Sequence, residues 1–185
     1  MMKKPVFSAR SMVFTAIMAA LLCIAAPFSL PIPSAVPLSL ATFMIYLIGA
    51  LLGKAKGSAA VGVYILIGAV GLPVFSGFMG GFAHVVGITG GYIIGYIPCV
   101  FLTGLLTELS CGKLRGIVTG MTLGTLALYA FGTVWFMLFT GSELTVALAG
   151  CVMPFLPFDV LKMIVACAVA VPLRNRLLPV IKGEK

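Results

Sequence analysis

All but one of the lysines and arginines of this chain gather in short clusters that long apolar segments separate. No Lys or Arg lies in the three connections at the opposite ends of those segments. Basic residues near the ends of membrane spans favour the cytoplasmic side. The pattern therefore predicts an all-α integral membrane protein with six transmembrane helices and both termini in the cytoplasm. The clusters are Lys3, Lys4 and Arg10; Lys54 and Lys56; Lys113 and Arg115; and Arg174, Arg176, Lys182 and Lys185.

The composition agrees with a membrane protein. Hydrophobic residues make up 62% of the chain and charged residues 9%, whereas soluble domains carry about 25% charged residues. One span needs roughly 20 apolar residues, so six spans use most of the 185 residues and leave no soluble domain. The net charge of +8 is explained by the ends of the spans, so we expect lipid around the protein and no nucleic acid partner.

We expect one membrane domain, residues 1–185, without a cleaved signal peptide, because the basic and apolar N-terminus lacks an A-x-A-like cleavage site. The five cysteines have no paired spacing and lie in apolar surroundings, which is typical of small buried hydrophobes and not of a metal site. The predicted spans are 8–27, 38–53, 58–72, 84–109, 117–139 and 157–178, and the extracellular loops are 28–37, 73–83 and 140–156.

The stretch Gly71–Tyr96 is too rich in glycine for an ordinary membrane helix. Irregular backbone at membrane depth is tolerated only where protein covers it or where it lines a cavity, so we expect one wall of a binding cavity here. Gly87, Gly91 and Gly95 are four residues apart and predict one helical stripe, beside a second stripe of Tyr92 and Tyr96. Helix packing is the simpler interpretation of these stripes, and a ligand wall is the alternative.

Two further segments have two interpretations each. Small residues in the first span, including Ala16 and Ala20, let helices approach closely, either within the bundle or against a partner subunit. The proline-rich segment Phe28–Leu40 cannot continue a helix and is either a flap over a cavity or a rigid linker. We interpret His84 and Trp135 as interfacial residues, and Trp135 also as a candidate ligand contact.

Asp159 and Lys162 lie three residues apart, on one face of the last predicted span. Capping of the helix start explains Asp159, but it does not explain Lys162, which lies about one turn deeper among apolar residues. A charge at the centre of a bilayer costs about 3 kcal/mol on insertion scales, and such charges mark substrate paths. We therefore favour a binding role for this pair.

Together these features predict a protein that binds a small, mostly apolar ligand with a few strong polar groups. The chain has no nucleotide-binding motif, so uphill transport would need an ATPase partner. Two other classes stay open. A lipid-modifying enzyme would need a catalytic cluster, and the sequence offers none, so we expect no catalytic residue. A secondary transporter would use Asp159 for proton coupling.

The strings VPLSLATFMIYLIGALLG, GLPVFSGFMGG and GITGGYIIGY resemble the BioY family, the biotin-specific S components of energy-coupling factor (ECF) transporters. TVWFMLFTG and CVMPFLPFDVLKMIVACAVAVPLRNRL are similar to the last two helices of that family. The resemblance extends from about Phe14 to Leu178.

The resemblance implies a six-helix S component in the bacterial cell membrane that captures biotin from outside. It implies a transmembrane coupling subunit and two ATPase subunits as partners, ATP used only by those ATPases, and no cofactor. The P-x-D-x-x-K pattern of the family falls on Pro157, Asp159 and Lys162, and its docking motif on Ala16 and Ala20. The other predicted substrate contacts are Phe75, Gly77, Met79, Gly91, Tyr92 and Trp135.

Three positions depart from the commonest family pattern. Ile88 stands where many relatives have proline, Met79 where relatives often have a polar residue, and Ala41 where many have glutamine. These differences leave open a weaker affinity for biotin, or a related small vitamin-like ligand.

Overall fold

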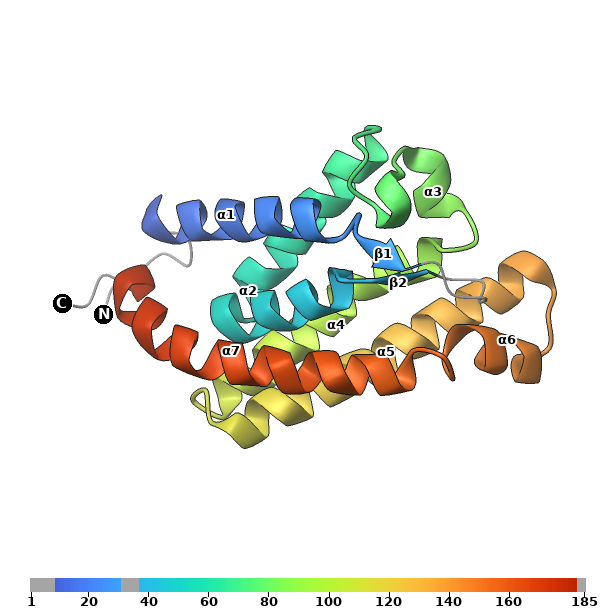
Figure 1. Cartoon of the computed structure of the whole chain (residues 1–185). Coiled ribbons are helices and arrows are strands. Elements are labelled where there is room, and N and C mark those ends of the chain that lie inside the picture. The colour runs from blue at the N-terminus through green and yellow to red at the C-terminus, as the bar shows by residue number, and fades with distance from the viewer. Residues whose placement is uncertain (1–8, 31–36, 183–185) are drawn as a thin grey trace.

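The computed structural model describes residues 9–30 and 37–182, with side chains up to Leu177 (Figure 1). Most of the described chain is helical, and its two strands are two residues long each. The elements in order are α1 (Ala9–Ala25), β1 (Ser29–Leu30), β2 (Leu38–Ser39), α2 (Ala41–Ala69), η1 (Ser76–Phe78), α3 (Phe82–Val86), α4 (Gly90–Leu109), α5 (Leu114–Thr140), α6 (Leu144–Cys151) and α7 (Leu156–Lys182).

Four helices of the described chain are long and apolar enough to cross a membrane, namely α2, α4, α5 and α7 up to Leu177. Helix α1 is apolar but has only 17 residues. Large apolar side chains are exposed on α1, α5 and α7, among them Ile24, Leu138 and Ile164, as expected where lipid surrounds the protein. The chain is therefore a helical, multi-pass membrane protein.

Helix α2 contains both the second and the third predicted spans. The sequence predicted separate helices, 38–53 and 58–72, joined by a basic turn; instead the helix begins at Ala41, continues to Ala69 and bends sharply at Gly53. Gly53 has φ 78° and ψ −176°, a conformation that favours glycine. Figure 1 shows the two halves of α2 leaving this bend in different directions. The predicted turn is reduced to the single residue Gly53. This is possible because side chains from other helices form hydrogen bonds with the backbone groups on either side of it.

The fourth predicted span, 84–109, is wrong at its start. Residues 82–86 form the separate short helix α3, and α4 begins only at Gly90. Gly87 between them is extended, with φ −79° and ψ −169°. The predicted stripe therefore keeps Gly91 and Gly95 but loses Gly87, which does not belong to the helix.

The predicted loops contain short elements of their own. Strands β1 and β2 pair antiparallel, with Ser29 opposite Ser39, and close the base of the proline-rich loop. Residues 31–36 of that loop, which include Pro31 and Pro33, lie outside the described residues, so the flap stays a prediction. The predicted loop 140–156 contains α6, whose Ala147 and Cys151 are buried.

Helices α2, α4 and α5 form the centre of the bundle, and α1 and α7 pack against α2. Glycines let α4 and α5 lie close together: a Cβ added at Gly120 would lie 3.0 Å from the Cα of Thr103. In Figure 1 the start of α1, the bend of α2, the α4–α5 turn and the end of α7 lie at one end of the bundle. Helices α3 and α6 and the β1–β2 ladder lie at the other end, where the candidate site is found.

Candidate functional site

Asp159 is the centre of a buried polar cluster in which three helices meet. The residue is 2% exposed, and its Oδ1 accepts a hydrogen bond from the Lys162 ammonium at 3.0 Å. Oδ2 accepts the hydroxyl hydrogen of Tyr129 on α5 at 2.7 Å. Buried charges are tolerated in proteins when they are paired and hydrogen-bonded, and Asp159 meets both conditions. The bonds are made by side chains, so Asp159 is more than a cap at the start of α7.

Thr42, in the first turn of α2, links the two charges. Its hydroxyl donates to Asp159 Oδ1 at 3.1 Å and accepts a hydrogen bond from Lys162 Nζ at 2.9 Å. A hydroxyl has one proton and two lone pairs, so both bonds form together. The ammonium and the carboxylate neutralise each other, and the cluster offers a donor and an acceptor without net charge.

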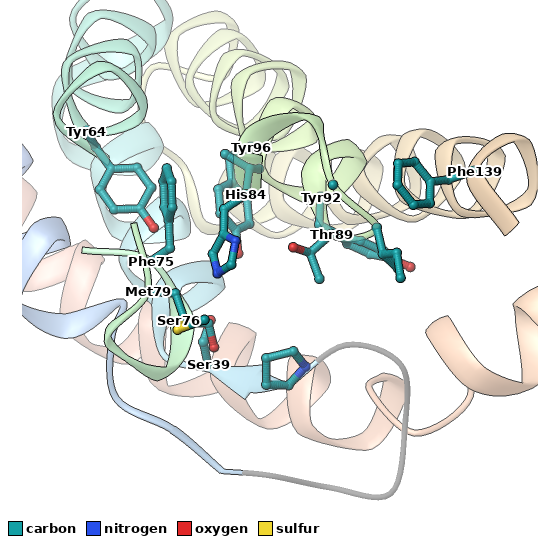
Figure 2. Close-up of a pocket in the computed structure, with 14 residues that line it drawn as sticks. Ser39, Tyr64, Phe75, Ser76, Met79, His84, Thr89, Tyr92, Tyr96 and Phe139 are labelled. Carbon is teal, nitrogen blue, oxygen red and sulfur yellow. The ribbon is translucent and has the colours of Figure 1, made fainter. Parts of the chain in front are cut away.

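A cavity of about 500 Å³ lies next to this cluster, and Figure 2 shows the side chains that line the cavity. Its volume lies in the usual range for small-molecule sites, roughly 300–1,000 Å³. The walls are mainly apolar and aromatic, with a few polar groups. The lining residues come from β2 and the proline before it, α2, the 73–81 loop, α3, the 87–89 segment, α4 and α5. They are Pro37, Ser39, Tyr64, Phe75, Ser76, Met79, His84, Gly87, Ile88, Thr89, Tyr92, Ile93, Tyr96 and Phe139.

The polar cluster opens into a smaller space, of about 30 Å³, that adjoins the large cavity. Asp159, Lys162, Thr42 and Tyr129 all line this small space. The two spaces share four lining residues, Pro37, Ser39, Tyr92 and Tyr96. A ligand that fills the large cavity can therefore extend a compact polar group toward Asp159 and Lys162.

The glycine-rich loop forms one wall of the large cavity through specific backbone contacts. Phe75 and Met79 pair as an isolated bridge, with the Phe75 N–H donating to the Met79 carbonyl at 2.8 Å. The connecting turn has positive φ at Gly77 and at Phe78. The Phe75 ring packs edge-on against Tyr64 of α2, with centroids 5.6 Å apart. The sequence prediction that this stretch contributes a cavity wall agrees with these positions.

The predicted substrate contacts fall into separate places. Phe75, Met79 and Tyr92 line the large cavity, whereas Gly77 faces a neighbouring groove beside the β1–β2 ladder. Gly91 and Trp135 line neither space of the site and instead pack against each other, since a Cβ added at Gly91 would overlap the Trp135 side chain.

Trp135 also donates its indole N–H to the Gly87 carbonyl at 2.9 Å. Gly91 and Trp135 thus belong to the contact between α4 and α5, which was the simpler of the two interpretations of the stripe.

Ala16 and Ala20 lie on the outer face of α1, and both are exposed. The neighbouring small residues Thr15 and Ala19 are buried. The two stripes of small residues are neighbours on α1, one facing the bundle and the other exposed, and the stripe of Ala16 and Ala20 is available for contact outside the described chain.

Several site residues were not predicted from the sequence. Thr42 and Tyr129 bind Asp159, and Ser39, Ser76 and Thr89 line the large cavity. His84 was interpreted as interfacial, but it too lines the cavity. Isolated Ser, Thr and Tyr residues are common in membrane helices, so only their convergence in space distinguishes these positions.

Within residues 9–30 and 37–182, no three His, Cys, Asp or Glu residues gather where they could hold a metal ion. The cysteines are all free thiols.

Comparison with known proteins shows the family. The BioY family model matches residues 1–179. This chain belongs to the BioY family. The Biotin transporter BioY of Thermotoga maritima is 36% identical over 166 residues, which cover 90% of this chain and 96% of the relative. The Probable biotin transporter BioY of Pyrococcus horikoshii is 36% identical over 162 residues, which cover 88% and 94%.

A solved structure supports the same assignment of the BioY chain. The crystal structure at 2.1 Å of the S-component for biotin from an ECF-type ABC transporter matches with a TM-score of 0.83 and 28% sequence identity. The match covers 90% of this chain and 91% of that chain. The predicted resemblance to BioY proteins is therefore confirmed.

Proposed function

We propose that this BioY protein is a high-affinity biotin-binding membrane subunit that mediates biotin uptake together with an ATP-driven ECF module. The observation that supports it most directly is the neutral cluster of Asp159, Lys162, Thr42 and Tyr129 beside a cavity of about 500 Å³. The named relatives are a biotin transporter and a probable biotin transporter, and the solved structural neighbour is an S-component for biotin.

The chemistry of biotin fits this cluster. The ureido group of biotin presents N–H donors beside a carbonyl acceptor. In the proposed complex the Asp159 carboxylate accepts an N–H hydrogen, and the Lys162 ammonium donates to the carbonyl. The bicyclic ring and the aliphatic chain of biotin would pack against the aromatic walls, among them Phe75 and Tyr92. The polar groups would then fix orientation while apolar burial supplies most of the affinity.

The proposal includes a topology of six spans in a single membrane domain. Helix α1, the two halves of α2 on either side of Gly53, and helices α4, α5 and α7 would be the six crossing segments. The end of the bundle that holds the bend of α2 and the α4–α5 turn would face the cytoplasm, because it carries basic residues such as Lys54 and Lys113. The cavity would then face the outside of a bacterial plasma membrane.

The proposed partners are a transmembrane coupling subunit and two ATPase subunits, with no cofactor on this chain. The exposed stripe of Ala16 and Ala20 on α1 supports docking of the coupling subunit, since small residues allow close helix contact in lipid.

Binding of radiolabelled biotin to the purified protein in nanodiscs tests the binding part. We expect saturable binding by the wild-type protein and a loss of at least about 10-fold in Asp159→Asn, because hydrogen bonds to charged groups contribute about 1.5–3 kcal/mol each. The matched control is Glu143→Gln, which neutralises an exposed carboxylate outside the site and should leave Kd unchanged. Unaltered affinity in Asp159→Asn would overturn the site assignment.

Growth of a biotin auxotroph, with and without a coexpressed ECF module, tests the transport part. Rescue that depends on the module supports an S component. Rescue that persists without the module and without ATP indicates a secondary transporter instead. Replacing Ala16 and Ala20 by leucine should reduce module-dependent rescue while leaving biotin binding by the purified protein intact.

A further inference from the structure

The large cavity has a second polar region besides the Asp159–Lys162 cluster. His84 of α3, Ser76 of the loop and Thr89 before α4 line the large cavity but not the small space beside Asp159. Figure 2 shows these three side chains among the sticks that surround the cavity. The site therefore places polar groups in two distinct positions.

The groups of this second region are poorly satisfied by the protein. The His84 imidazole forms no hydrogen bond or ion pair with the part of the chain that the structure describes. The Ser76 hydroxyl oxygen is buried and has no partner there either. An unsatisfied buried polar group is costly, so a ligand that bonds to these groups would remove that cost.

The charges decide which end of a ligand each region suits. At the first region the Lys162 ammonium is already neutralised by Asp159 at 3.0 Å. A ligand carboxylate placed there would lie beside the Asp159 carboxylate, and like charges repel. At the second region no acidic side chain lines the cavity among the described residues, and the titratable neighbours are Tyr64 of α2 and Tyr92 and Tyr96 of α4.

We propose that His84 binds the carboxylate of the ligand, with the Ser76 hydroxyl as a second donor, and so selects acids over their neutral amides. This inference rests on the proposed function, because it assigns the other end of the same ligand. An imidazole keeps at least one N–H donor in either protonation state, and a hydroxyl donates one hydrogen. Both can therefore bond to a carboxylate that extends from a ring held near Asp159.

The test compares the affinities for biotin and for biotinamide, which differ only in the charge and the donors of the terminal group. The wild-type protein should prefer biotin. His84→Ala should weaken biotin binding about 10- to 100-fold, since it loses a charged hydrogen bond, and should change biotinamide binding less than about threefold. His84→Gln, which keeps an N–H donor, should give an intermediate loss for biotin.

Asp159→Asn is the reference variant and should weaken both ligands alike. Biotinamide binding also reports whether each His84 variant is folded. Unchanged biotin affinity in His84→Ala, or equal losses for both ligands, would overturn the assignment of His84 while the proposed function stands. A wild-type protein that binds neither ligand would overturn the proposed function and this inference with it.

Discussion

Two polar sites lie at opposite ends of the bundle, and they use their charges differently. At the end that holds the candidate site, Asp159 and Lys162 form an ion pair and accept or donate hydrogen bonds with side-chain hydroxyls next to a cavity. At the other end, Glu108 and Arg174 bond to backbone groups at the bend of α2.

The bonds at the bend replace one missing helical hydrogen bond. In a continuous helix the Lys54 N–H would donate to the Ala50 carbonyl four residues earlier. The bend at Gly53 separates them, so the Lys54 N–H donates to Glu108 Oε1 at 3.0 Å, and the Ala50 carbonyl accepts a hydrogen bond from Arg174 Nη1. Each charge also has the sign that the adjacent helix end favours.

The difference shows how to separate structural from functional charges in a membrane protein. Glu108 and Arg174 satisfy backbone groups that the fold has exposed, so their role is explained within the chain. Asp159 and Lys162 satisfy no backbone group in the described bonds, and they border a cavity. We expect substitutions of Glu108 or Arg174 to change the stability of the protein. We expect substitutions of Asp159 or Lys162 to change ligand binding.

The largest expected effect is that of Lys162→Met, which removes the ammonium but keeps an apolar stem of similar length. We expect Kd for biotin to rise at least about 100-fold, because a charged hydrogen bond to the ligand is lost and Asp159 loses its counter-ion. Isothermal titration calorimetry measures this change. The control is Lys113→Met, at an exposed position before α5. A similar loss of biotin affinity in both variants would contradict the assignment of Lys162 to ligand binding.

Arg174→Met should have the opposite pattern. The Ala50 carbonyl loses its partner, so we expect the free energy of unfolding to fall by about 1–3 kcal/mol while Kd for biotin stays the same. Denaturation in mixed micelles gives the stability. The exposed Arg176 provides a matched control, Arg176→Met, which should be neutral. A change in Kd for biotin without a change in the free energy of unfolding would show that Arg174 acts in binding and not in stability.

A smaller loss is expected from Tyr129→Phe, which removes only the hydroxyl that bonds to Asp159 Oδ2. We expect about tenfold weaker biotin binding, the equivalent of about 1.4 kcal/mol, because Asp159 is held less firmly. The control is Tyr46→Phe, which removes another buried hydroxyl, bonded to Thr125 at 2.6 Å, from a residue that lines neither space of the site. Tyr46→Phe should lower the melting temperature without changing Kd, and equal affinities in both variants would refute a special role for Tyr129.

The smallest effect is expected from Glu108→Gln. The amide oxygen of glutamine can still accept the Lys54 N–H hydrogen, so only the charge is lost, and we expect less than about 1 kcal/mol of destabilisation. Glu108→Ala loses the acceptor as well and should be more destabilised. Identical melting temperatures for the two variants would show that the backbone bond contributes nothing.

Much of the fold could be predicted because the membrane restricts it. Long apolar segments must be helical, and the predicted boundaries of the fifth and last spans differ from α5 and α7 by only a few residues up to Leu177. The errors fall where the backbone is irregular. Gly53 replaces a whole turn, and Gly87 precedes α4 instead of belonging to it, because tertiary partners determine how a glycine-containing segment bends.

The site divides in the same way. The sequence by itself determined that Asp159 and Lys162 need a reason to lie within an apolar helix, since an unpaired charge within a membrane span is costly. Only the tertiary structure decided what satisfies them. Thr42 is 117 residues from Asp159 and Tyr129 is 30 residues away. Their meeting depends on the rotation of α2 and α5 about their axes, which helix packing fixes and local sequence does not.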